Sequence, residues 1–415
     1  MLPPPTPKEL EIKDLGSRTN TGTAPSDPLL EHMDFITKRA ISPPSNDTEH
    51  ILAELLLIRE SIISGFAGAH SQSIQLPSAS GPALGTAKPF DIALVAGDLI
   101  TPDVADAIAR SGSSLAMIPL LEMGRERATK TLRDLRPSCL LSVGFIAELA
   151  TICNALDIPY FAWQTDPFFD TLPKYSDDLF DSTSIFIHDP DLHVHFNDAG
   201  FRSVKYLPLA ANTDRRAPLD PLSALWNKFK CQLSFAGSSM RANARTRGTP
   251  ECETEAADFR LTACRALESL GLVVYGPEDW TMTEPQSLDY RGPIRNGPDL
   301  TALYSATTVN IDLPRTYQPN VVNMRVFDCM ACGGFILVPD NASIDELFDI
   351  GEEIVTYSSP ADLVHKVQYA LSHDEWRHNI AASGRARVLR DHDFSNRLET
   401  IFEGTELWPS SQPVL

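Results

Sequence analysis

The fold is decided by the stretch Tyr317-Gln-Pro-Asn-Val-Val-Asn-Met-Arg-Val-Phe-Asp-Cys-Met-Ala-Cys-Gly-Gly-Phe-Ile-Leu-Val-Pro339. Its pattern predicts a loop, a short helix, a Gly-Gly turn and an apolar strand. Asn320 falls where the loop meets the helix, and Asp328 follows two turns later in similar helical phase. A carboxylate in such apolar surroundings needs partners. Arg325, three residues earlier, is one candidate partner, and a bound ligand is the other.

Composition bounds the class of protein. The 415 residues favour two domains, and the formal net charge of −20 disfavours nucleic acid and anionic membranes as partners. No apolar run approaches the roughly 18 residues of a membrane span, and the first residues lack the pattern of a signal peptide. We therefore expect a cytoplasmic protein with no membrane span. The sequence does not indicate an oligomeric state.

The seven cysteines indicate reduced thiols, because an odd number is scattered along a chain large enough to need no disulfide framework. Cys329 and Cys332 form a Cys-x-x-Cys, but no second pair stands at zinc-site spacing. We expect both to be small core residues, and we expect no metal site and no cofactor.

Changes in composition and periodicity divide the chain. Residues 1–88 are expected to form a Pro/Ser-rich leader with a docked helix over 48–69. A first Rossmann-like domain (89–212) is followed by a linker (213–228) and a second Rossmann-like domain (229–393). A C-terminal helix and tail (394–415) can cross back to the first domain.

Short apolar strands alternate with amphipathic helices in both central segments. Examples are the strands expected at 91–96, 139–143, 160–163, 231–236 and 308–312. This alternation predicts an α/β fold of two Rossmann-like parallel-sheet domains facing a cleft, preceded by an N-terminal extension. In such sheets, ligands bind at the carboxyl ends of the strands.

Two acidic segments follow strands in the first domain. Asp166 stands just after the strand at 160–163, where it either faces the cleft or caps a loop. Asp189-Pro190-Asp191 has the spacing of a metal-binding Asp-x-Asp, but an acidic N-cap followed by proline is a better match to the start of a helix. We therefore interpret it as a helix start.

The second domain begins with a feature suited to phosphate. Gly237 and Ser238 follow the strand at 231–236, and a basic cluster that includes Arg241 and Arg245 comes next. Backbone N–H groups and guanidinium groups at a strand end fit a pyrophosphate. A solvated loop is the alternative. Further along, the Arg291-Gly292 turn either approaches a nucleotide base or is simply a tight turn.

The opening stretch also carries a family resemblance. Asn320-x-x-Asn323-x-Arg325-Val-Phe-Asp328-x-x-Ala-Cys-Gly333-Gly-Phe, followed by Asp345-Glu-Leu-Phe and Gly351-Glu-Glu-Ile-Val-Thr-Tyr, resembles the C-terminal half of the CgeB-like (spore-maturation) glycosyltransferases. The likeness runs on to about Arg397. It implies the GT-B fold and a nucleotide-sugar donor. By this resemblance the ribose diol is held at Asp328, the base lies near the Arg291-Gly292 turn, and the phosphates lie near Gly237 and Ser238.

The sequence departs from the family pattern at two positions. Asp328 replaces the usual glutamate, and Asn320 stands where many relatives of the wider group have the first acid of a Glu-x7-Glu pair. The resemblance implies a retaining hexosyltransferase acting on an unknown acceptor, which is a glycan, a protein or a small molecule. Arginines and helix N-termini can stabilise the departing diphosphate, so we expect no obligatory metal. The motifs assign no catalytic base, and Asp166 is our candidate for one. The departures keep open a non-catalytic protein that binds a nucleotide-sugar or a partner. A nucleotide-sugar epimerase is a third possibility.

Overall fold

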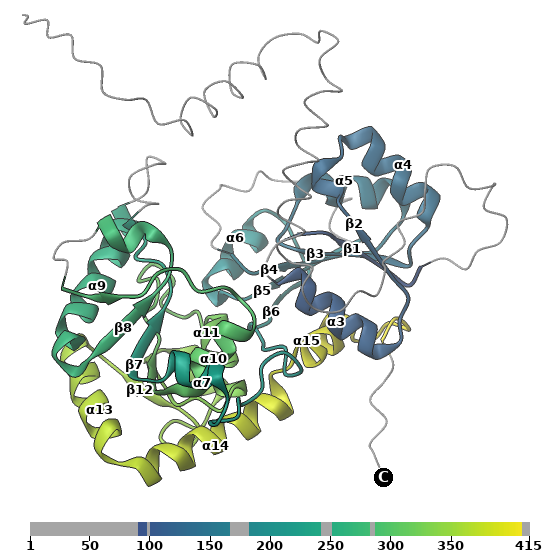
Figure 1. Cartoon of the computed structure of the whole chain (residues 1–415). Helices are drawn as coiled ribbons and strands as arrows, with labels where there is room; N and C mark the ends of the chain where they lie inside the picture. The colour runs from purple at the N-terminus through teal and green to yellow at the C-terminus, as the bar shows by residue number, and fades with distance from the viewer. Residues whose placement is uncertain (1–89, 98–99, 167–181, 242–250, 283–286, 409–415) are drawn as a thin grey trace, which may run out of the picture. The chain divides into compact units, whose positions relative to one another are not determined.

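The structure is a computed structural model (Figure 1). The predicted leader, its helix over 48–69 and Arg245 lie outside the residues that it describes. The described residues belong to one compact unit, Thr86–Leu415. They are 90–97, 100–166, 182–241, 251–282 and 287–408.

The first sheet has six parallel strands in the order β2-β1-β3-β4-β5-β6. Side chains of β1 alternate between the two faces, so Ile92 and Leu94 enter one core while Ala93 and Val95 enter another. Both faces are therefore buried, which explains the continuous apolar runs in the sequence. The strands are β1 (Ile92–Val95), β2 (Leu115–Ile118), β3 (Cys139–Val143), β4 (Tyr160–Gln164), β5 (Thr183–Ile187) and β6 (Val204–Tyr206).

Helices cover both faces of this sheet. On one face lie α3 (Thr101–Ser111) and α15 (Phe394–Ile401). On the other lie α4 (Arg125–Leu135), α5 (Ala147–Leu156) and α6 (His193–Asp198). Short 3-10 turns occur at η1 (Leu120–Glu122) and η3 (Pro190–Leu192). The Asp189 side chain accepts a hydrogen bond from the backbone N–H of Asp191 at the start of η3, which confirms the helix-start interpretation.

The second sheet also has six parallel strands, in the order β12-β11-β10-β7-β8-β9. Its strands are β7 (Cys231–Ala236), β8 (Leu272–Tyr275), β9 (Asp289–Tyr290), β10 (Thr307–Ile311), β11 (Ile336–Pro339) and β12 (Val355–Tyr357). Two parallel α/β sheets in sequence are what the alternation of strands and helices predicted, so the fold class is confirmed.

Helices sandwich the second sheet as well. One face is covered by α9 (Glu251–Leu267) and α13 (Pro360–Ser372). The other is covered by α7 (Ala224–Phe229), α10 (Pro298–Ala306), α11 (Met324–Ala331) and α14 (Asp374–Asp391). Shorter elements are α12 (Ala342–Leu347), η4 (Glu268–Leu270) and η5 (Glu278–Met282).

The helix α11 and its Gly-Gly turn are set by local chemistry. The Asn323 side chain caps the helix by accepting from the backbone N–H of Arg325 at 3.0 Å. At the other end, Gly333 takes the left-handed φ of +73°, which glycine adopts without strain. A Cβ at Gly334 would lie 2.5 Å from the carbonyl oxygen of Tyr304, so only glycine fits there. The turn predicted from sequence thus directs the chain into β11.

The chain crosses between the sheets twice, and the two crossings are paired. Ala211 and Asp393 form a parallel bridge, with the N–H of Ala211 donating to His392 O at 3.0 Å. Beyond this point α15 packs on the first sheet, where the ring of Phe394 lies 5.9 Å from that of Trp163. The last described helix is therefore part of the first sheet's core, although it follows the second sheet in sequence.

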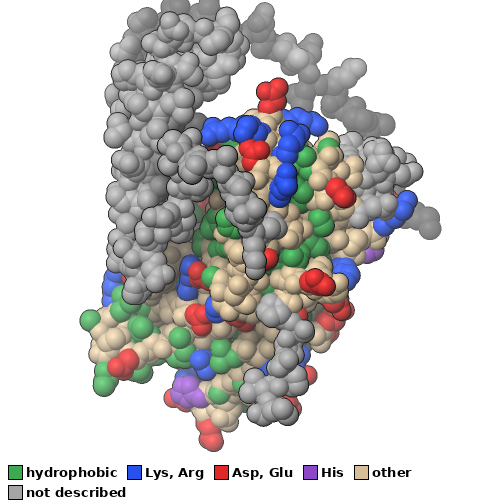
Figure 2. All heavy atoms as spheres, turned by 90° about the vertical axis from the view of Figure 1, so that its right-hand side faces the viewer, with side chains coloured by type: hydrophobic (Ala, Val, Ile, Leu, Met, Phe, Trp, Pro, Cys, Tyr) green, Lys and Arg blue, Asp and Glu red, His purple; other side chains and the backbone are tan. Residues whose placement is uncertain are grey.

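Surface charge is uneven. Lys and Arg side chains gather near the top of the described surface in Figure 2, while acidic side chains are scattered over the whole of that face. Helix α4 carries four basic residues against two acidic ones. The net charge of −20 therefore describes the chain as a whole and not this helix.

Candidate functional site

A cavity of about 680 Å³ lies at the carboxyl ends of strands from both sheets. Thr165, Asp166 and His188 line it from the ends of β4 and β5. Gly237 and Gly276 line it from the ends of β7 and β8. This is the edge at which parallel α/β sheets bind ligands, so the cavity is the candidate functional site.

Two glycines let β7 and β8 end side by side at the cavity floor. The N–H of Gly237 donates to Tyr275 O at 2.9 Å, and the carbonyl of Gly237 accepts from Trp280 Nε1 at 2.7 Å. A Cβ at Gly276 would lie 2.1 Å from that same carbonyl oxygen, and one at Gly237 would lie 2.6 Å from a guanidinium nitrogen of Arg325. Side chains at either position would therefore displace the floor.

Three arginines line the cavity beside these glycines: Arg260, Arg315 and Arg325. Arg325 donates to Ala236 O at 2.7 Å and pairs with Asp312. Arg315 donates to the Gln318 side chain at 3.3 Å. Three guanidinium groups face two carboxylates on this side, Asp312 and the cavity-lining Glu253, so it keeps a net positive charge and is suited to an anion.

Arg260 is the most confined of the three. Its side chain comes from α9, is buried, and donates to Ser238 O at 2.8 Å and Pro314 O at 3.3 Å. Burial, reinforced by the charge of Arg325, lowers the pKa of Arg260 to about 10, so it stays protonated at neutral pH. Both guanidinium groups lie over the Phe235 ring, with Cζ of Arg325 4.9 Å and Cζ of Arg260 5.7 Å from the ring centre.

Asp328 lines the cavity from α11 and is only 4% exposed. Its Oδ2 lies 3.1 Å from Nε of Arg216, which comes from the connection between the sheets. The partner considered from sequence, Arg325, is instead bound to Asp312, so that pairing is wrong. Burial raises the pKa of Asp328 to about 6, although Arg216 opposes the rise.

The two asparagines of the predicted site have different places. Asn323 lines the cavity and donates to Asp312 at 2.6 Å, which fixes the carboxylate that holds Arg325. Asn320 donates to both carboxylate oxygens of Asp191, at 3.2 and 3.4 Å. Asn320 therefore links the loop between β10 and α11 of the second sheet to η3, which follows β5 of the first sheet.

Other predicted residues lie around the cavity rather than on its wall. Arg241 pairs with Asp258 at 2.6 Å, and Arg291 pairs with Asp289 at 2.8 Å. Gly292 has a φ of +90° and accepts a hydrogen bond from the N–H of Gly276 at 3.1 Å, so its turn adjoins the cavity floor. Gly333 lies beside Pro218.

The first sheet contributes a carboxylate and an imidazole. Asp166 is exposed, and its backbone carbonyl accepts from the Gln164 side chain at 2.9 Å. His188 is buried, with Nδ1 2.9 Å from the backbone carbonyl of Gln164. Because a carbonyl only accepts, Nδ1 carries the proton and Nε2 is an acceptor. Burial lowers the pKa of His188 to about 4, so the ring is neutral at pH 7.

Sequence reasoning missed Arg216, Arg260 and His188 as cavity or site residues. Arg216 lies in a linker without periodicity, and Arg260 lies within an expected helix whose phase alone does not show that it is buried. His188 begins a segment with three histidines in eight residues. Its position directly after a strand was the signal that could have identified it.

Neither a metal-binding cluster nor a membrane-spanning helix occurs within the described ranges. No group of three or more His, Cys, Asp or Glu side chains there is arranged to hold a metal ion. No helix among those residues has both the length and the apolar character of a membrane span. The seven cysteines are all free.

Comparisons with known proteins place the fold. A family model described as glycosyl transferase-like matches residues 258–403, which include α10, α11 and the following turn. No curated protein sequence matches the chain.

Solved structures give the wider likeness. A glycosyltransferase from Rickettsia africae matches with a TM-score of 0.55 and 10% identity, over 77% of this chain and 100% of that one. HepE from Anabaena, in complex with UDP and glucose, matches with a TM-score of 0.52 and 11% identity, over 75% and 98%. Sucrose-phosphate synthase from Thermosynechococcus elongatus matches with a TM-score of 0.50 and 12% identity, over 74% and 96%. At these identities the likeness establishes the fold, which is GT-B.

Proposed function

We propose that the protein transfers a sugar from a nucleotide-sugar to a hydroxyl-bearing acceptor. The observation that carries this proposal is the cavity itself. It presents three guanidinium groups, from Arg260, Arg315 and Arg325, and the buried carboxylate of Asp328 at the carboxyl ends of the second sheet, while Glu253 of α9 is a second buried carboxylate in its lining. A diphosphate and a neighbouring diol need that combination of donors and an acceptor. The glycosyl transferase-like match over the same region supports the proposal.

The donor would lie along the end of the second sheet. Its diphosphate would contact the guanidinium groups and approach the backbone at Gly237, where a side chain would clash with Arg325. The ribose diol would donate to Asp328, as the resemblance implies for this position. The base would lie toward the turn at Gly292, which is bonded to the cavity floor through Gly276.

Catalysis would be electrostatic. The bond between the anomeric carbon and the phosphate oxygen breaks, and the nucleoside diphosphate leaves with the electron pair. The guanidinium groups are already in place to stabilise that charge, so no metal ion is required. The acceptor oxygen bonds to the anomeric carbon and gives its proton to Asp166, the candidate catalytic base. Retention of configuration is the course that the resemblance implies.

The acceptor would enter from the side of the first sheet. Asp166 is exposed there, and His188 presents a neutral ring whose Nε2 accepts a hydrogen bond. Both groups can orient an acceptor hydroxyl. An Asp166→Asn variant tests the role of that carboxylate: unchanged transfer would rule it out as a catalytic base.

The direct test is release of the nucleoside diphosphate. Because HepE is a structural neighbour with bound UDP, UDP-glucose and UDP-galactose come first, followed by GDP-mannose. We expect slow hydrolysis of one donor, faster release when its acceptor is present, and loss of both in an Asp328→Ala variant. Tight binding of a nucleotide-sugar with no turnover in any acceptor screen would contradict transferase activity.

That second outcome corresponds to a binding protein without catalysis. The hydrogen bonds between Asn320 and Asp191 favour this alternative, because they occupy a position where the wider group has an acid. An Asn320→Glu variant separates the two possibilities. A binding protein shows no turnover either before or after the substitution.

A further inference from the structure

Arg216 is held by the second sheet's helices although it belongs to the connection between the sheets. Its side chain is only 6% exposed. One terminal nitrogen donates to Gly297 O at 3.2 Å and to Thr301 Oγ1 at 2.9 Å, and the other is bonded to the Asn296 side chain. Both ends of the guanidinium fork are therefore anchored at the start of α10. The direction of the remaining nitrogen, Nε, is fixed by these contacts.

The remaining nitrogen faces the buried carboxylate. Nε of Arg216 lies 3.1 Å from Oδ2 of Asp328, and both side chains are almost fully buried. Among the residues that the structure describes, none donates a hydrogen bond to Oδ1 of Asp328, and Asp328 lines the cavity. A carboxylate that is paired through one oxygen can still accept hydrogen bonds through the other.

We propose that Arg216 is the positioning residue of the nucleotide site, which keeps Asp328 ionised and aims its free oxygen at the donor's ribose diol. This inference rests on the proposed function but adds a residue that makes no contact with the substrate. An unpaired carboxylate at this depth would take up a proton, and a carboxylic acid is a poorer acceptor for two hydroxyl groups.

The charged and titratable neighbours of Asp328 support this role. Asp103 of α3 raises the pKa of Asp328, whereas Arg216 is the cation that lowers it. Burial raises the pKa of Tyr304 on α10, of Cys329 on α11 and of Cys332 just after α11, so these groups are neutral at pH 7. The ionisation of Asp328 therefore depends on Arg216. With that residue present, burial still holds the pKa of Asp328 at about 6.

The test is the pH dependence of donor affinity in the full-length protein. The probes are UDP-glucose and GDP-mannose, measured by calorimetry from about pH 6 to about pH 8.5, where their diphosphates stay ionised. The wild type should reach full affinity just above the pKa of Asp328. Arg216→Met should bind at least about tenfold more weakly at neutral pH and regain affinity as pH rises, because one unit of pKa is a factor of ten.

Conservative and neighbouring variants separate positioning from simple structural support. Arg216→Lys keeps the positive charge but loses the forked guanidinium group. It should recover most of the affinity at neutral pH. Its midpoint, the pH at which donor affinity is half its maximum, should be shifted less than that of Arg216→Met. Arg215→Met removes the adjacent charge, whose partners are Asp103 and Asp106, and should leave the midpoint where it is in the wild type.

The outcomes are distinguishable. If the wild type binds neither probe, the proposed function fails. If the wild type binds but Arg216→Met has the same affinity, or is weakened equally at every pH, the positioning role fails alone. If Arg216→Met does not fold, Thr301→Val is the deciding variant, because it removes the 2.9 Å hydrogen bond that anchors Arg216. The pH at which donor affinity is half its maximum must then rise. An unchanged value overturns the inference.

Discussion

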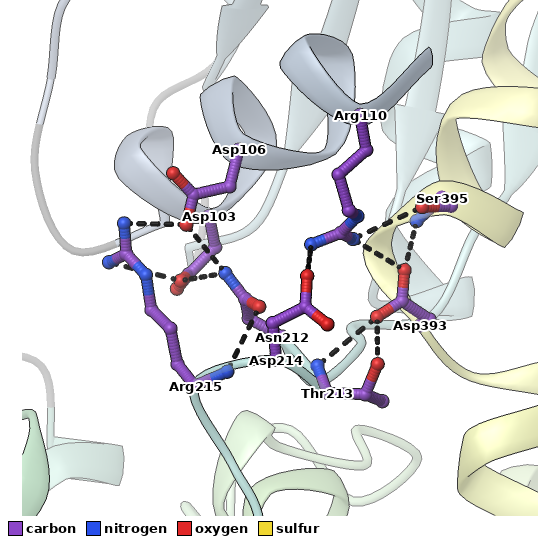
Figure 3. A network of polar contacts seen from close by, with 9 residues as sticks. All are labelled: Asp103, Asp106, Arg110, Asn212, Thr213, Asp214, Arg215, Asp393 and Ser395. Atoms are coloured by element: carbon purple, nitrogen blue, oxygen red, sulfur yellow. Dashed lines mark hydrogen bonds and ion pairs between the residues drawn. The ribbon is translucent and has the colours of Figure 1, made fainter.

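Thr213 and Asp393 lie on the two separate crossings between the sheets, and they are joined by two hydrogen bonds. The hydroxyl and the backbone N–H of Thr213 donate to the same carboxylate oxygen of Asp393, at 2.7 and 3.1 Å (Figure 3). The other oxygen accepts from Arg110 of α3 at 2.8 Å and from the N–H of Ser395 at 2.7 Å. One carboxylate thus fastens both crossings to the first sheet and caps α15.

Asp393→Ala should lower the unfolding free energy by about 1–2 kcal/mol, since it removes a helix cap and leaves Arg110 with one partner fewer. Asp214→Ala is the matched control. That carboxylate pairs with the same arginine but is exposed, so its loss should cost less than about 1 kcal/mol. Denaturant unfolding at neutral pH measures both, and equal effects would contradict the crossing role.

The Asp393 effect should also depend on pH. Burial raises the pKa of this carboxyl, but the hydrogen bonds from Ser395 and Thr213 outweigh burial and hold the pKa below its usual value. A lowered carboxyl pKa stabilises the fold above the unfolded pKa and loses that effect as pH falls through the folded one. The difference between wild type and Asp393→Ala should therefore shrink in acid.

His392 predicts a second and separate acid effect. Its Nε2 donates to Leu347 O at 3.2 Å, and its Nδ1 accepts from Arg397 at 2.8 Å. Burial, followed by the charge of Arg397, lowers the pKa from 6.5 to about 4. The unfolded chain then takes up the proton first, so this histidine stabilises the fold above pH 6.5 and loses that effect as pH falls toward 4.

His392→Gln should therefore show a shallower fall in unfolding free energy between pH 6.5 and 4 than the wild type. His188 continues to contribute in the variant, so the slope should decrease but not vanish. His365→Gln, on the exposed side of α13, is the control and should keep the wild-type slope. An identical slope in all three proteins would show that His392 is not held neutral.

Gly276→Ala should damage the floor of the cavity. The added Cβ would meet the carbonyl oxygen of Gly237 at 2.1 Å, so one of the two strand ends must move. We expect a loss of about 1–3 kcal/mol in unfolding free energy, as for overpacked interiors, and weaker nucleotide binding. Gly124→Ala has open space around its Cβ, so it should lose only the helix-cap preference of glycine over alanine, about 1 kcal/mol or less, and leave nucleotide binding unchanged.

Arginine substitutions can locate the diphosphate. Arg315→Met should weaken UDP-glucose binding about tenfold or more, because one charge-assisted hydrogen bond contributes about 1.5–3 kcal/mol. Arg241→Met should change the affinity less than twofold or so, because Arg241 is engaged by Asp258 and is not among the described residues that line the cavity. The reverse ranking in calorimetry would favour the phosphate contact expected from sequence.

Much of the fold could be predicted because strand and helix periodicities are local. The Gly333-Gly334 turn was readable too, since a positive φ and a close carbonyl both demand glycine. The ion pairs could not be predicted in the same way. Asp328 had Arg325 within one helical turn, yet packing brings Arg216 to it from the linker and gives Arg325 to Asp312.

The arginine-lined side of the cavity shows the same difference between local and distant information. A glycine followed by arginines after a strand is a local signal, and it identified Gly237 and Ser238, which do line the cavity. Arg260 and Arg315 reach the cavity from α9 and from the loop after β10, so their contribution depends on how distant segments pack. The roles of these residues in binding remain predictions to be measured.

We propose that Asp328 forms part of a nucleotide-sugar site. Calorimetric titration of UDP-glucose and GDP-mannose into wild type and Asp328→Asn, at a pH above about 7 where this carboxyl is ionised, tests it most directly. We predict that the wild type binds one of them and that Asp328→Asn, while remaining folded, binds it at least about tenfold more weakly, the loss of one charged hydrogen-bond acceptor. Binding of equal strength in the two proteins, or no binding to the wild type, would contradict the account.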